Sequence, residues 1–456
     1  REGRILEALA LVHDVLPFAA FCGRACPHPC EQECVRNEFE APISIMAIKR
    51  FLADLGYAAG IAPSSEVSEG VHWLRVAVVG AGPAGLSAAD TLARLGCRVT
   101  VFDGNEEPGG MMRYAIAEFR FPSAAGLSDV KAIFERNIRF EGGMRLGRDF
   151  TFSDIGNQGY DALLLAVGTG DSIRLPGAGG EKEGFHDALA FLASARLGNP
   201  CPTYGKVAVI GGGNVAIDAA RVAVRLGAQD VTVVCLESRE AMPAFPWEVE
   251  GAVAEGVRIL PSAAVKKFHM RAGKVAGFDA LAVEKIGFDE KGGIISHTVP
   301  GSEFEVRADM VIMAVGSRAS LDFLPSSASR KAVDPANHVY RLIFGEKDFK
   351  IPAYMCGDCV SGPGSVVEAS ASGRAAALNI YEQLCVQEVR KARFEDNYRR
   401  AHEPQVSDRP EWRIRRQAPR LAPEESRRTF QEIERRFPEE SVHHETERCA
   451  RCNLTL

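Results

Sequence analysis

The 456-residue sequence lacks any apolar run that approaches the roughly 18 residues needed to cross a bilayer, so we expect no membrane span. It also lacks blocks of basic residues, because acidic and basic side chains are interspersed and the formal net charge is -6. A nucleic-acid partner is therefore not expected. The length is sufficient for about three domains, and small molecules and other proteins are the expected partners.

Cysteines are too few for a disulfide framework, at twelve in the whole chain. Six of them lie in close groups near the two ends, which favours metal ligation in a reducing compartment. The sequence opens at Arg1, without an initiating methionine or a signal-peptide pattern. We therefore expect a cytoplasmic protein with further residues upstream of Arg1.

The first part of the chain has the apolar spacing of helices on both sides of a cysteine group. The apolar positions are Ile5, Leu9, Val12 and Leu16 before Pro17, and Ile45, Ile48 and Leu52 further on. A stretch with Pro, Ser and Gly, residues 60–70, then predicts a linker. An abrupt apolar strand at 76–79 indicates that a new domain begins there.

From that strand onward a βαβ pattern occurs twice, because residues 75–103 match residues 206–237 in order and type. Each copy has a strand, a glycine-rich turn, an Ala-rich helix and a second strand that ends in an acid, as a dinucleotide-binding unit requires. The strand-like segment 308–315 and the segment 354–379 are expected to return the chain to the first unit. The second unit would then be inserted within the first.

The first glycine-rich turn follows a strand and opens a helix, which is the context that a pyrophosphate-binding turn requires. Its residues are Gly80, Gly82, Pro83, Ala84 and Gly85. Asp103, at the end of the next strand, is expected to accept hydrogen bonds from ribose hydroxyls. Between the two copies lies the turn Pro108-Gly109-Gly110-Met111, whose two glycines lack side chains, so that a flavin ring could lie against the backbone.

The second turn is the G-x-G-x-x-A variant in the same strand-turn-helix context, so a second dinucleotide is expected. Its residues are Gly211, Gly213, Asn214, Val215 and Ala216.

Six segments follow one another over nearly the whole chain: the Cys-rich helical segment, GAGPAGLSAA, PGGMMRYAIAEFRFP, GGGNVAIDAARVAVRLGA, SREAMPA and GDCVSGPGSVVEASASGRAAA. In this order they resemble the glutamate synthase small-subunit family of FAD-containing oxidoreductases. That family also includes flavin subunits of larger iron-sulfur and metal enzymes. The resemblance therefore implies electron transfer to or from a nicotinamide dinucleotide, and it does not fix the final substrate.

The resemblance also implies roles for particular residues. Gly357 and Asp358 are expected to contact the ribityl and pyrophosphate region of the flavin, and Ser365 and Val366 to begin a helix beneath its ring. A helix N-terminus there supplies backbone donors and partial positive charge, which favour the anion formed on flavin reduction. The expected contacts are completed by Gly168 for FAD and Gly316 for the nicotinamide dinucleotide.

We thus predict an α/β protein with two Rossmann-like dinucleotide-binding domains preceded by a small helical iron-sulfur domain. The expected boundaries are 1–73 for the helical domain, 74–200 and 308–385 for the two parts of the FAD domain, 201–307 for the inserted NAD(H) domain, and 386–456 for a C-terminal arm. The arm is Arg- and Glu-rich, and Phe430, Ile433 and Phe437 recur in it at helical spacing.

The choice of nicotinamide follows from charge, because a 2′-phosphate needs a basic partner whereas a ribose diol suits a carboxylate. The second unit ends in Glu237, where many NADPH-using relatives have basic residues. NAD(H) is therefore expected rather than NADP(H). Arg239 belongs to the family's SRE motif and is the residue that would read a phosphate instead.

Cys22, Cys26, Cys30 and Cys34 recur every four residues, which predicts iron-sulfur ligation. On one helix they would span about 18 Å, too far for a single cubane, but two prolines break that helix. The resemblance implies 4Fe-4S clusters that also use an earlier cysteine motif, and it supports the last three cysteines better than Cys22. The terminal pair, Cys449 and Cys452, has C-x2-C spacing and is a further candidate for ligation or for docking on a partner. Cys356 and Cys359 share that spacing but flank the flavin motif, and we expect them to be packing residues.

The expected function is an FAD-containing, NAD(H)-dependent electron-transfer subunit of a larger enzyme. Hydride would pass between the nicotinamide and the flavin, and single electrons between the flavin and clusters of this chain or of an iron-sulfur or metal-cofactor catalytic subunit. One alternative is the NADPH-dependent small subunit of glutamate synthase. Another, of a different class, is a non-catalytic FAD-binding scaffold or nicotinamide sensor.

Overall fold

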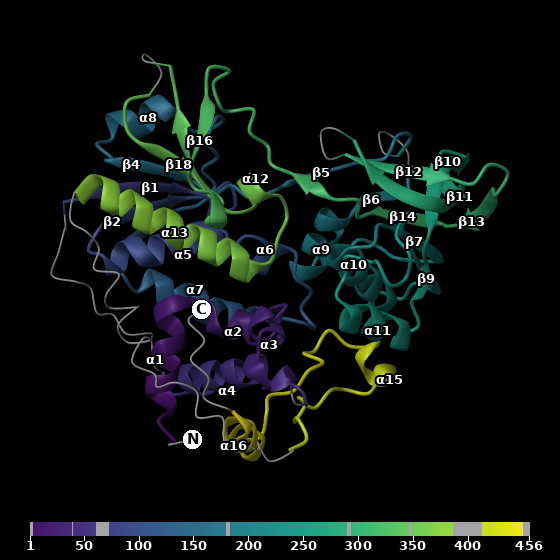
Figure 1. Cartoon of the computed structure of the whole chain (residues 1–456). Helices are drawn as coiled ribbons and strands as arrows, with labels where there is room; N and C mark the ends of the chain where they lie inside the picture. The colour runs from purple at the N-terminus through teal and green to yellow at the C-terminus, as the bar shows by residue number, and fades with distance from the viewer. Residues whose placement is uncertain are drawn as a thin grey trace.

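A computed structural model of the chain describes residues 3–38, 40–60, 73–178, 183–289, 293–345, 349–385 and 413–449. A small helical domain, two α/β units and a C-terminal arm lie together in it (Figure 1). No helix in these ranges has the length and apolar character needed to cross a membrane.

The helical domain confirms the two helices predicted from apolar spacing. Its elements are α1 (Ile5–Val15), α2 (Ala19–Cys22), α3 (Pro29–Gln32), the 3-10 helix η1 (Val35–Glu38) and α4 (Ile45–Ala58). α1 ends before Leu16, because a residue that precedes proline disfavours helical geometry. Leu9 of α1 and Phe51 of α4 are buried in one apolar cluster. The predicted linker lies outside the described residues from position 61 onward.

The first α/β unit has a seven-stranded sheet in the order β16-β17-β18-β4-β1-β2-β3. Its strands are β1 (Arg75–Val79), β2 (Arg98–Phe102), β3 (Ile138–Glu141), β4 (Ala162–Leu165), β16 (Ser329–Asp334), β17 (Val339–Ile343) and β18 (Ala353–Met355). β18, β4, β1, β2 and β3 are parallel, and β17 and β16 are antiparallel additions. The sheet is thus assembled from two segments far apart in the sequence.

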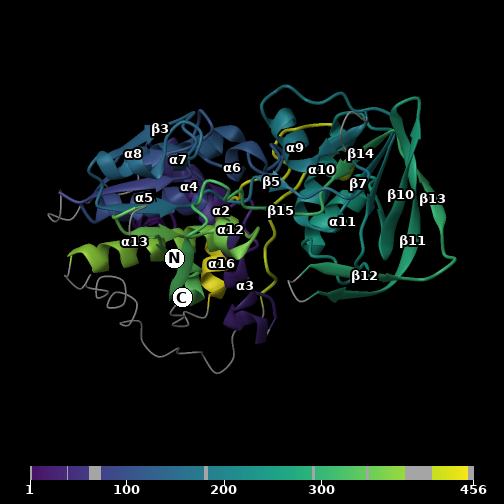
Figure 2. The same cartoon turned by 90° about the horizontal axis from the view of Figure 1, so that it is seen from above.

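Helices cover this sheet and connect its strands. They are α5 (Pro83–Arg94), α6 (Met111–Tyr114), α7 (Ser123–Phe134), α8 (Phe152–Asn157), η2 (Pro335–Asn337), α12 (Asp358–Ser361) and α13 (Val366–Cys385). α13 runs beside α5 in both views (Figures 1 and 2). The approach is close because position 373 is glycine: a Cβ there would overlap the carbonyl oxygen of Ala84.

The second unit has a five-stranded parallel sheet in the order β6-β14-β7-β8-β9. Its strands are β6 (Phe185–Asp187), β7 (Lys206–Ile210), β8 (Asp230–Val234), β9 (Arg258–Leu260) and β14 (Met310–Met313), with helices α9 (Ala188–Arg196), α10 (Asn214–Arg225) and α11 (Pro246–Ala254). An antiparallel sheet lies beside it, made of β10 (Ala263–Arg271), β11 (Lys274–Phe288), β12 (Ile294–Thr298) and β13 (Phe304–Arg307). The short strands β5 (Asp171–Ser172) and β15 (Ser317–Arg318) pair where the chain passes between the units.

Two expected boundaries of the second unit need correction. β6 and α9 come before residue 201, yet β6 pairs with β14 and α9 packs against α10. The expectation that 308–315 returns the chain to the first unit is wrong, because β14 lies between β6 and β7. The sequence of a buried, apolar parallel strand does not show which of two parallel sheets the strand joins.

Residues 413–449, called the arm below, pack against the helical domain and the second unit. They include α15 (Pro423–Ser426) and α16 (Glu439–Arg448). Phe430 and Ile433 pack against the core of the second unit, but residues 430–437 are not helical. In Figure 1 the arm, drawn in yellow, passes from beneath the helical domain to beneath the second unit.

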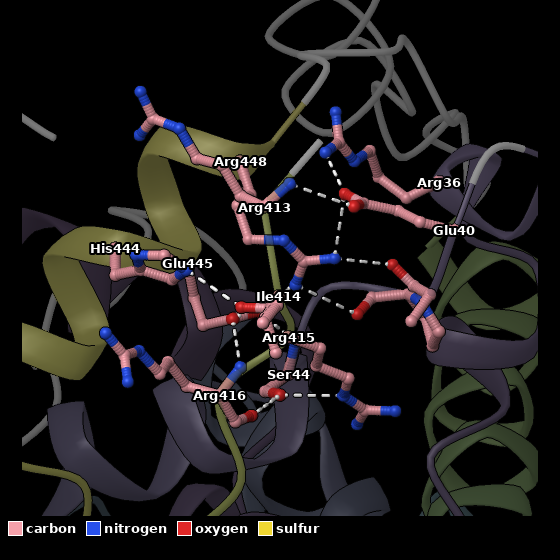
Figure 3. A network of polar contacts seen from close by, with 12 residues as sticks. Arg36, Glu40, Ser44, Arg413, Ile414, Arg415, Arg416, His444, Glu445 and Arg448 are labelled. Carbon is pink, nitrogen blue, oxygen red and sulfur yellow. Dashed lines mark hydrogen bonds and ion pairs between the residues drawn. The ribbon is translucent and has the colours of Figure 1, made fainter. Parts of the chain in front are cut away.

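Buried charges attach the arm to the helical domain. Glu445 accepts hydrogen bonds from the backbone N–H groups of Ser44 (3.0 Å) and Arg416 (2.7 Å), and Arg415 donates to the Ser44 hydroxyl at 2.9 Å (Figure 3). Arg448, as buried as Glu445, forms an ion pair with it at 2.8 Å. Because both charges are paired and hydrogen-bonded, their burial is compatible with a stable contact.

Candidate functional site

The first glycine-rich turn connects β1 to α5 at the carboxyl edge of the sheet. Gly80 has φ +110°, and a Cβ at this position would overlap the carbonyl oxygen of Ala166, so only glycine fits. Gly82 is the N-cap of α5, Pro83 is its first residue, and Ala84 and Gly85 are buried in its first turn. A Cβ at Gly82 would have its nearest neighbour, the Cα of Gly110, at 4.0 Å. This open space before a helix N-terminus fits a pyrophosphate.

Asp103 and Gly110 lie beside this turn. The Asp103 carboxylate follows β2 and accepts a hydrogen bond from the backbone N–H of Ala81 at 2.6 Å. Gly110 has φ +52°, and its Cβ would lie 2.7 Å from the Cα of Gly82, so the two backbones approach closely. Met111 begins α6 and is 40% exposed. The sequence-predicted residues from three segments are therefore adjacent.

The remaining candidates for the FAD site follow other strands at the same edge. Gly168 comes after β4, has φ +66° and has open space where a Cβ would be. Gly357 comes after β18, and its backbone N–H donates to the Ser372 hydroxyl at 2.9 Å. Burial raises the pKa of Asp358, the first residue of α12, to about 6. Ser365 accepts a hydrogen bond from the Glu368 backbone N–H at 3.3 Å, one turn into α13, which begins at Val366.

The second turn repeats the geometry of the first. Gly211 has φ +133°, and its backbone N–H donates to the carbonyl of Val234 in β8 at 2.8 Å. Gly213 is the N-cap of α10, and nothing lies within 4 Å of where its Cβ would be. Asn214, Val215 and Ala216 form the first turn of α10. Gly316 follows β14 at the same edge, with φ +108°. This turn thus also leaves room for a pyrophosphate.

Glu237 lies over the second turn. A Cβ added at Gly212 would be 2.7 Å from the Glu237 Oε2 atom, so the carboxylate is next to the turn backbone. The Arg239 Nη1 atom lies 3.6 Å from the sulfur of Met242. The Glu237 carboxylate is thus in place to meet a ribose bound at the turn.

The four cysteines of the N-terminal segment lie in or beside the short helices of the helical domain. Cys22 ends α2, Cys26 lies in the next loop, Cys30 is in α3, and Cys34 precedes η1. A hydrogen bond with Cys22 lowers the pKa of the Cys26 thiol to about 6, and Lys49 and the backbone N–H of His28 assist.

A thiol with this pKa is largely thiolate at neutral pH, which is the form that ligates iron. The donor chemistry at Cys26 therefore fits an iron-sulfur centre. In the ranges that the structure describes, however, no three His, Cys, Asp or Glu side chains are grouped to hold a metal ion. The complete ligand set stays a prediction.

The two C-x2-C pairs differ in what the structure describes. Cys449 follows α16, whereas Cys452 lies outside the described residues. Cys356 and Cys359 are free thiols, and the Cys359 thiol donates to the carbonyl of Cys356 at 3.2 Å. Burial raises the pKa of Cys359 to about 11. These features are consistent with the packing role expected for this second pair.

Sequence reasoning missed several residues that shape the site. Gly373 allows α13 to approach the first turn, and a glycine inside an Ala-rich helix was the available signal. Arg120, from the loop before α7, forms ion pairs with Asp218 (2.7 Å) and Glu248 (3.3 Å) of the second unit. No local pattern marks Arg120 as a bridge between units.

Comparison with protein families gives two matches along the chain. Residues 74–373 match the family described as pyridine nucleotide-disulphide oxidoreductase. Residues 1–61 match the family described as dihydropyrimidine dehydrogenase domain II, 4Fe-4S cluster. Together these matches cover both α/β units and the helical domain.

Curated relatives cover most of the chain. The chain is 34% identical to the NADP(+)-dependent formate dehydrogenase subunit beta of Moorella thermoacetica, over 99% of this chain and 68% of that protein. It is 36% identical to the NADPH-Fe(3+) oxidoreductase subunit beta of Geobacter sulfurreducens, over 72% of this chain but only 49% of that protein. It is 32% identical to the glutamate synthase [NADPH] small chain of Escherichia coli, over 84% of each chain.

Among solved structures, the chain is similar to Mycobacterium tuberculosis FprA in complex with NADPH. The TM-score is 0.54 and the identity 19%, over 71% of this chain and 86% of that one. At this identity the likeness shows the fold of the two α/β units.

Proposed function

Since the chain belongs to the pyridine nucleotide-disulphide oxidoreductase family, in the group that includes glutamate synthase small chains, we propose that it is the NAD(H)-dependent flavin subunit of a larger electron-transfer enzyme. Its family and its N-terminal match make it a flavin-dependent pyridine nucleotide oxidoreductase with an iron-sulfur domain. The preference for NAD(H), the ligands of the clusters and the partner are the parts that we propose.

When bound, FAD exchanges a hydride with the nicotinamide and single electrons with iron-sulfur clusters, so the protein needs to supply position and electrostatics rather than a nucleophile. In the proposed arrangement, Gly82 and Gly213 leave space for the two pyrophosphates at helix N-termini. Asp103 and Glu237 would accept hydrogen bonds from the two adenosine riboses. The N-terminus of α13 would supply backbone donors and partial positive charge to the flavin, which favour its anionic form.

The observation that carries the choice of nicotinamide is the position of the Glu237 carboxylate beside Gly212. A carboxylate there would accept hydrogen bonds from a 2′,3′-diol and would repel a 2′-phosphate. The relatives named above carry NADP(+) or NADPH in their names. The proposal therefore assigns this chain a different nicotinamide from the one in their names.

Steady-state dye reduction with NADH and with NADPH tests this proposal. Wild type is expected to favour NADH in kcat/KM by at least tenfold, which requires only about 1.4 kcal/mol in the transition state. Glu237→Arg is expected to narrow or reverse the ratio, because it removes the repulsion and offers the phosphate a bidentate partner.

Glu240→Arg is the matched control, since it makes the same change of charge at an exposed position three residues away. Its cofactor ratio should stay close to that of wild type. A wild-type preference for NADPH would show that Arg239 or another residue reads a phosphate and that the NAD(H) assignment is wrong.

The partner is proposed from the names of the relatives, which are beta subunits or small chains. We expect a catalytic subunit that carries iron-sulfur or metal cofactors. Purification of the native complex tests this directly: a glutamate-forming large subunit would instead identify the chain as a glutamate synthase small subunit. Absence of flavin bleaching by either NADH or NADPH would favour a non-catalytic scaffold or sensor.

A further inference from the structure

Three aromatic rings connect the second unit to the cysteine segment. Phe245 stacks on Trp247 with ring centroids 4.9 Å apart and an interplanar angle of 8°. Trp247 packs against His28 at 4.8 Å and 38°. Trp247 lies in the first turn of α11 and His28 directly before α3. The rings therefore cross from one domain to the other.

One end of this row is attached to the second glycine-rich turn. The backbone N–H of Ala244 donates to the carbonyl of Gly212 at 3.0 Å. The backbone N–H of Phe245 donates to the Asn214 side-chain oxygen, also at 3.0 Å. A dinucleotide that orders this turn would thus also order Phe245 and the ring stacked on it.

The other end is attached to the Cys26 thiol. The His28 backbone N–H donates to the Cys26 sulfur at 3.3 Å, and His28 Nδ1 lies 3.0 Å from the Cys26 carbonyl oxygen. His28 has φ +43°, a left-handed conformation that residues other than glycine adopt rarely and at a cost. Pro29 disfavours helical geometry at His28 as well. This conformation needs external contacts to persist, and the Trp247 ring is one of them.

We propose that Trp247 is a positioning residue that couples occupancy of the second dinucleotide turn to the reduction potential of the iron-sulfur centre ligated by Cys26. The inference rests on the proposed function for both sites. By holding His28 in its strained conformation, the ring maintains the N–H to sulfur hydrogen bond, and such bonds help to set cluster potentials. Coupling of this kind is reciprocal, so reduction of the centre would tighten binding at the turn.

Redox titration of the EPR signal of the protein's iron-sulfur centre, with and without ADP-ribose, tests the coupling. ADP-ribose keeps the pyrophosphate and adenosine but has no nicotinamide, so it cannot accept a hydride. In wild type we expect it to bind about tenfold more tightly to the reduced protein, which raises the midpoint potential by about 59 mV for one electron.

Trp247→Ala should abolish this shift and retain ADP-ribose binding and iron content. Trp247→Phe keeps a ring between Phe245 and His28 and should retain most of the shift. Trp73→Ala is the control, because this tryptophan is 62% exposed, and it should behave as wild type. A shift that survives Trp247→Ala, or wild type that binds ADP-ribose without any shift, would overturn the proposal.

Hydrogen exchange at the His28 amide gives a second measurement that does not depend on the cluster, and it decides the matter if Trp247→Ala loses iron. ADP-ribose should slow this exchange in wild type and leave it unchanged in Trp247→Ala, whereas equal slowing in both would contradict the coupling. Parallel titrations with 2′-phospho-ADP-ribose test the coupling and the NAD(H) assignment separately. If only the phosphorylated ligand binds and produces the shift, the coupling stands and the NAD(H) assignment fails.

Discussion

At the scale of single residues, the candidate FAD site depends on a glycine at position 82, where any larger residue would add a side chain. Gly82 has φ -81°, which any L-residue adopts, so its identity is not explained by backbone conformation. What distinguishes the position is the open space where its Cβ would be, since the nearest atom there, the Cα of Gly110, is 4.0 Å away. That space fits a pyrophosphate, and a side chain would fill it.

Gly82→Val is therefore expected to abolish FAD binding while the chain still folds. Flavin content is read from the visible absorption of the purified variant, and folding from its circular dichroism. Gly156→Val, in α8, is the matched control, since its Cβ would meet only Phe349 at 3.9 Å, and it should retain flavin. A fully flavinated Gly82→Val protein would move the FAD site away from this turn.

At the scale of elements, the contact between α5 and α13 holds the two parts of the first unit together. The Ser87 hydroxyl of α5 donates to the carbonyl of Ser370 in α13 at 2.8 Å, and Gly373 allows the backbones to approach. Because the atom opposite Gly373 belongs to the backbone of Ala84, an added side chain cannot be accommodated by a change of rotamer.

Gly373→Val is accordingly expected to destabilise the first unit by about 3 kcal/mol or more, at the upper end of overpacking costs, and to lower its flavin content. Thermal unfolding monitored by flavin release measures both effects. Ala371→Val, two residues earlier on the exposed face of α13, provides the comparison and should unfold close to wild type. Equal melting temperatures for the two variants would mean that α5 and α13 accommodate a side chain at position 373 without loss of stability.

Local patterns predicted much of this architecture. The strands β1 and β7, their glycine turns and the helices α5 and α10 were identified because a strand, a tight turn and a helix N-terminus have short-range signatures. The sheet that β14 joins was not predicted, because buried parallel strands are uniformly apolar. The apolar residues at 430–437 have helical spacing but lie in irregular backbone, where Phe430 and Ile433 pack on the core of the second unit. Their spacing reflects tertiary contacts rather than a helix.

The candidate site was predicted to a similar degree. Glycines and acids at strand ends were found from sequence, since each position is set by its own βαβ unit. The contacts of Trp247 with His28 and of Arg120 with Asp218 were not found, because they join segments that are distant in the chain.

At the scale of the whole molecule, the arm contacts the three other parts through ion pairs and hydrogen bonds. Glu432 lies 2.7 Å from Arg24 and 2.8 Å from Arg50 in the helical domain. The backbone N–H of Ile433 donates to the carbonyl of Phe119, in the first unit, at 3.0 Å. On the second unit, the Ser426 hydroxyl donates to Glu255 at 3.0 Å. The arm should therefore limit movement of the second unit relative to the first.

The ionisation of Glu255 predicts that the stability of the folded chain depends on pH. Burial opposes its ionisation, but hydrogen bonds from Arg225 and Arg221 outweigh burial and lower its pKa to about 2, from an ordinary 4.5. A carboxyl whose pKa is lowered by folding stabilises the folded state above its unfolded pKa, and this contribution is lost as the pH falls from about 4.5 towards 2. At neutral pH the contribution is about 3 kcal/mol.

Glu255→Gln should therefore lower the urea midpoint at pH 7, and its difference from wild type should shrink below pH 4.5. Glu303→Gln serves as the control, because its ion pair with Lys266 is exposed, and it should cause no measurable change. A difference between Glu255→Gln and wild type that stays constant down to pH 3 would exclude the ionised carboxylate as its source.

The interrupted sheet of the first unit has a consequence for synthesis of the chain. β4 leaves the ribosome early, but β18, its neighbour in the sheet, is made only after the whole second unit. At roughly 5 to 20 residues per second, this interval lasts on the order of ten seconds or longer. During it the contiguous second unit can complete its parallel sheet, whereas β4 has an unpaired edge. The dinucleotide turn that is translated first therefore belongs to the domain that is finished last, and flavin capture should follow the folding of the nicotinamide domain in the nascent chain.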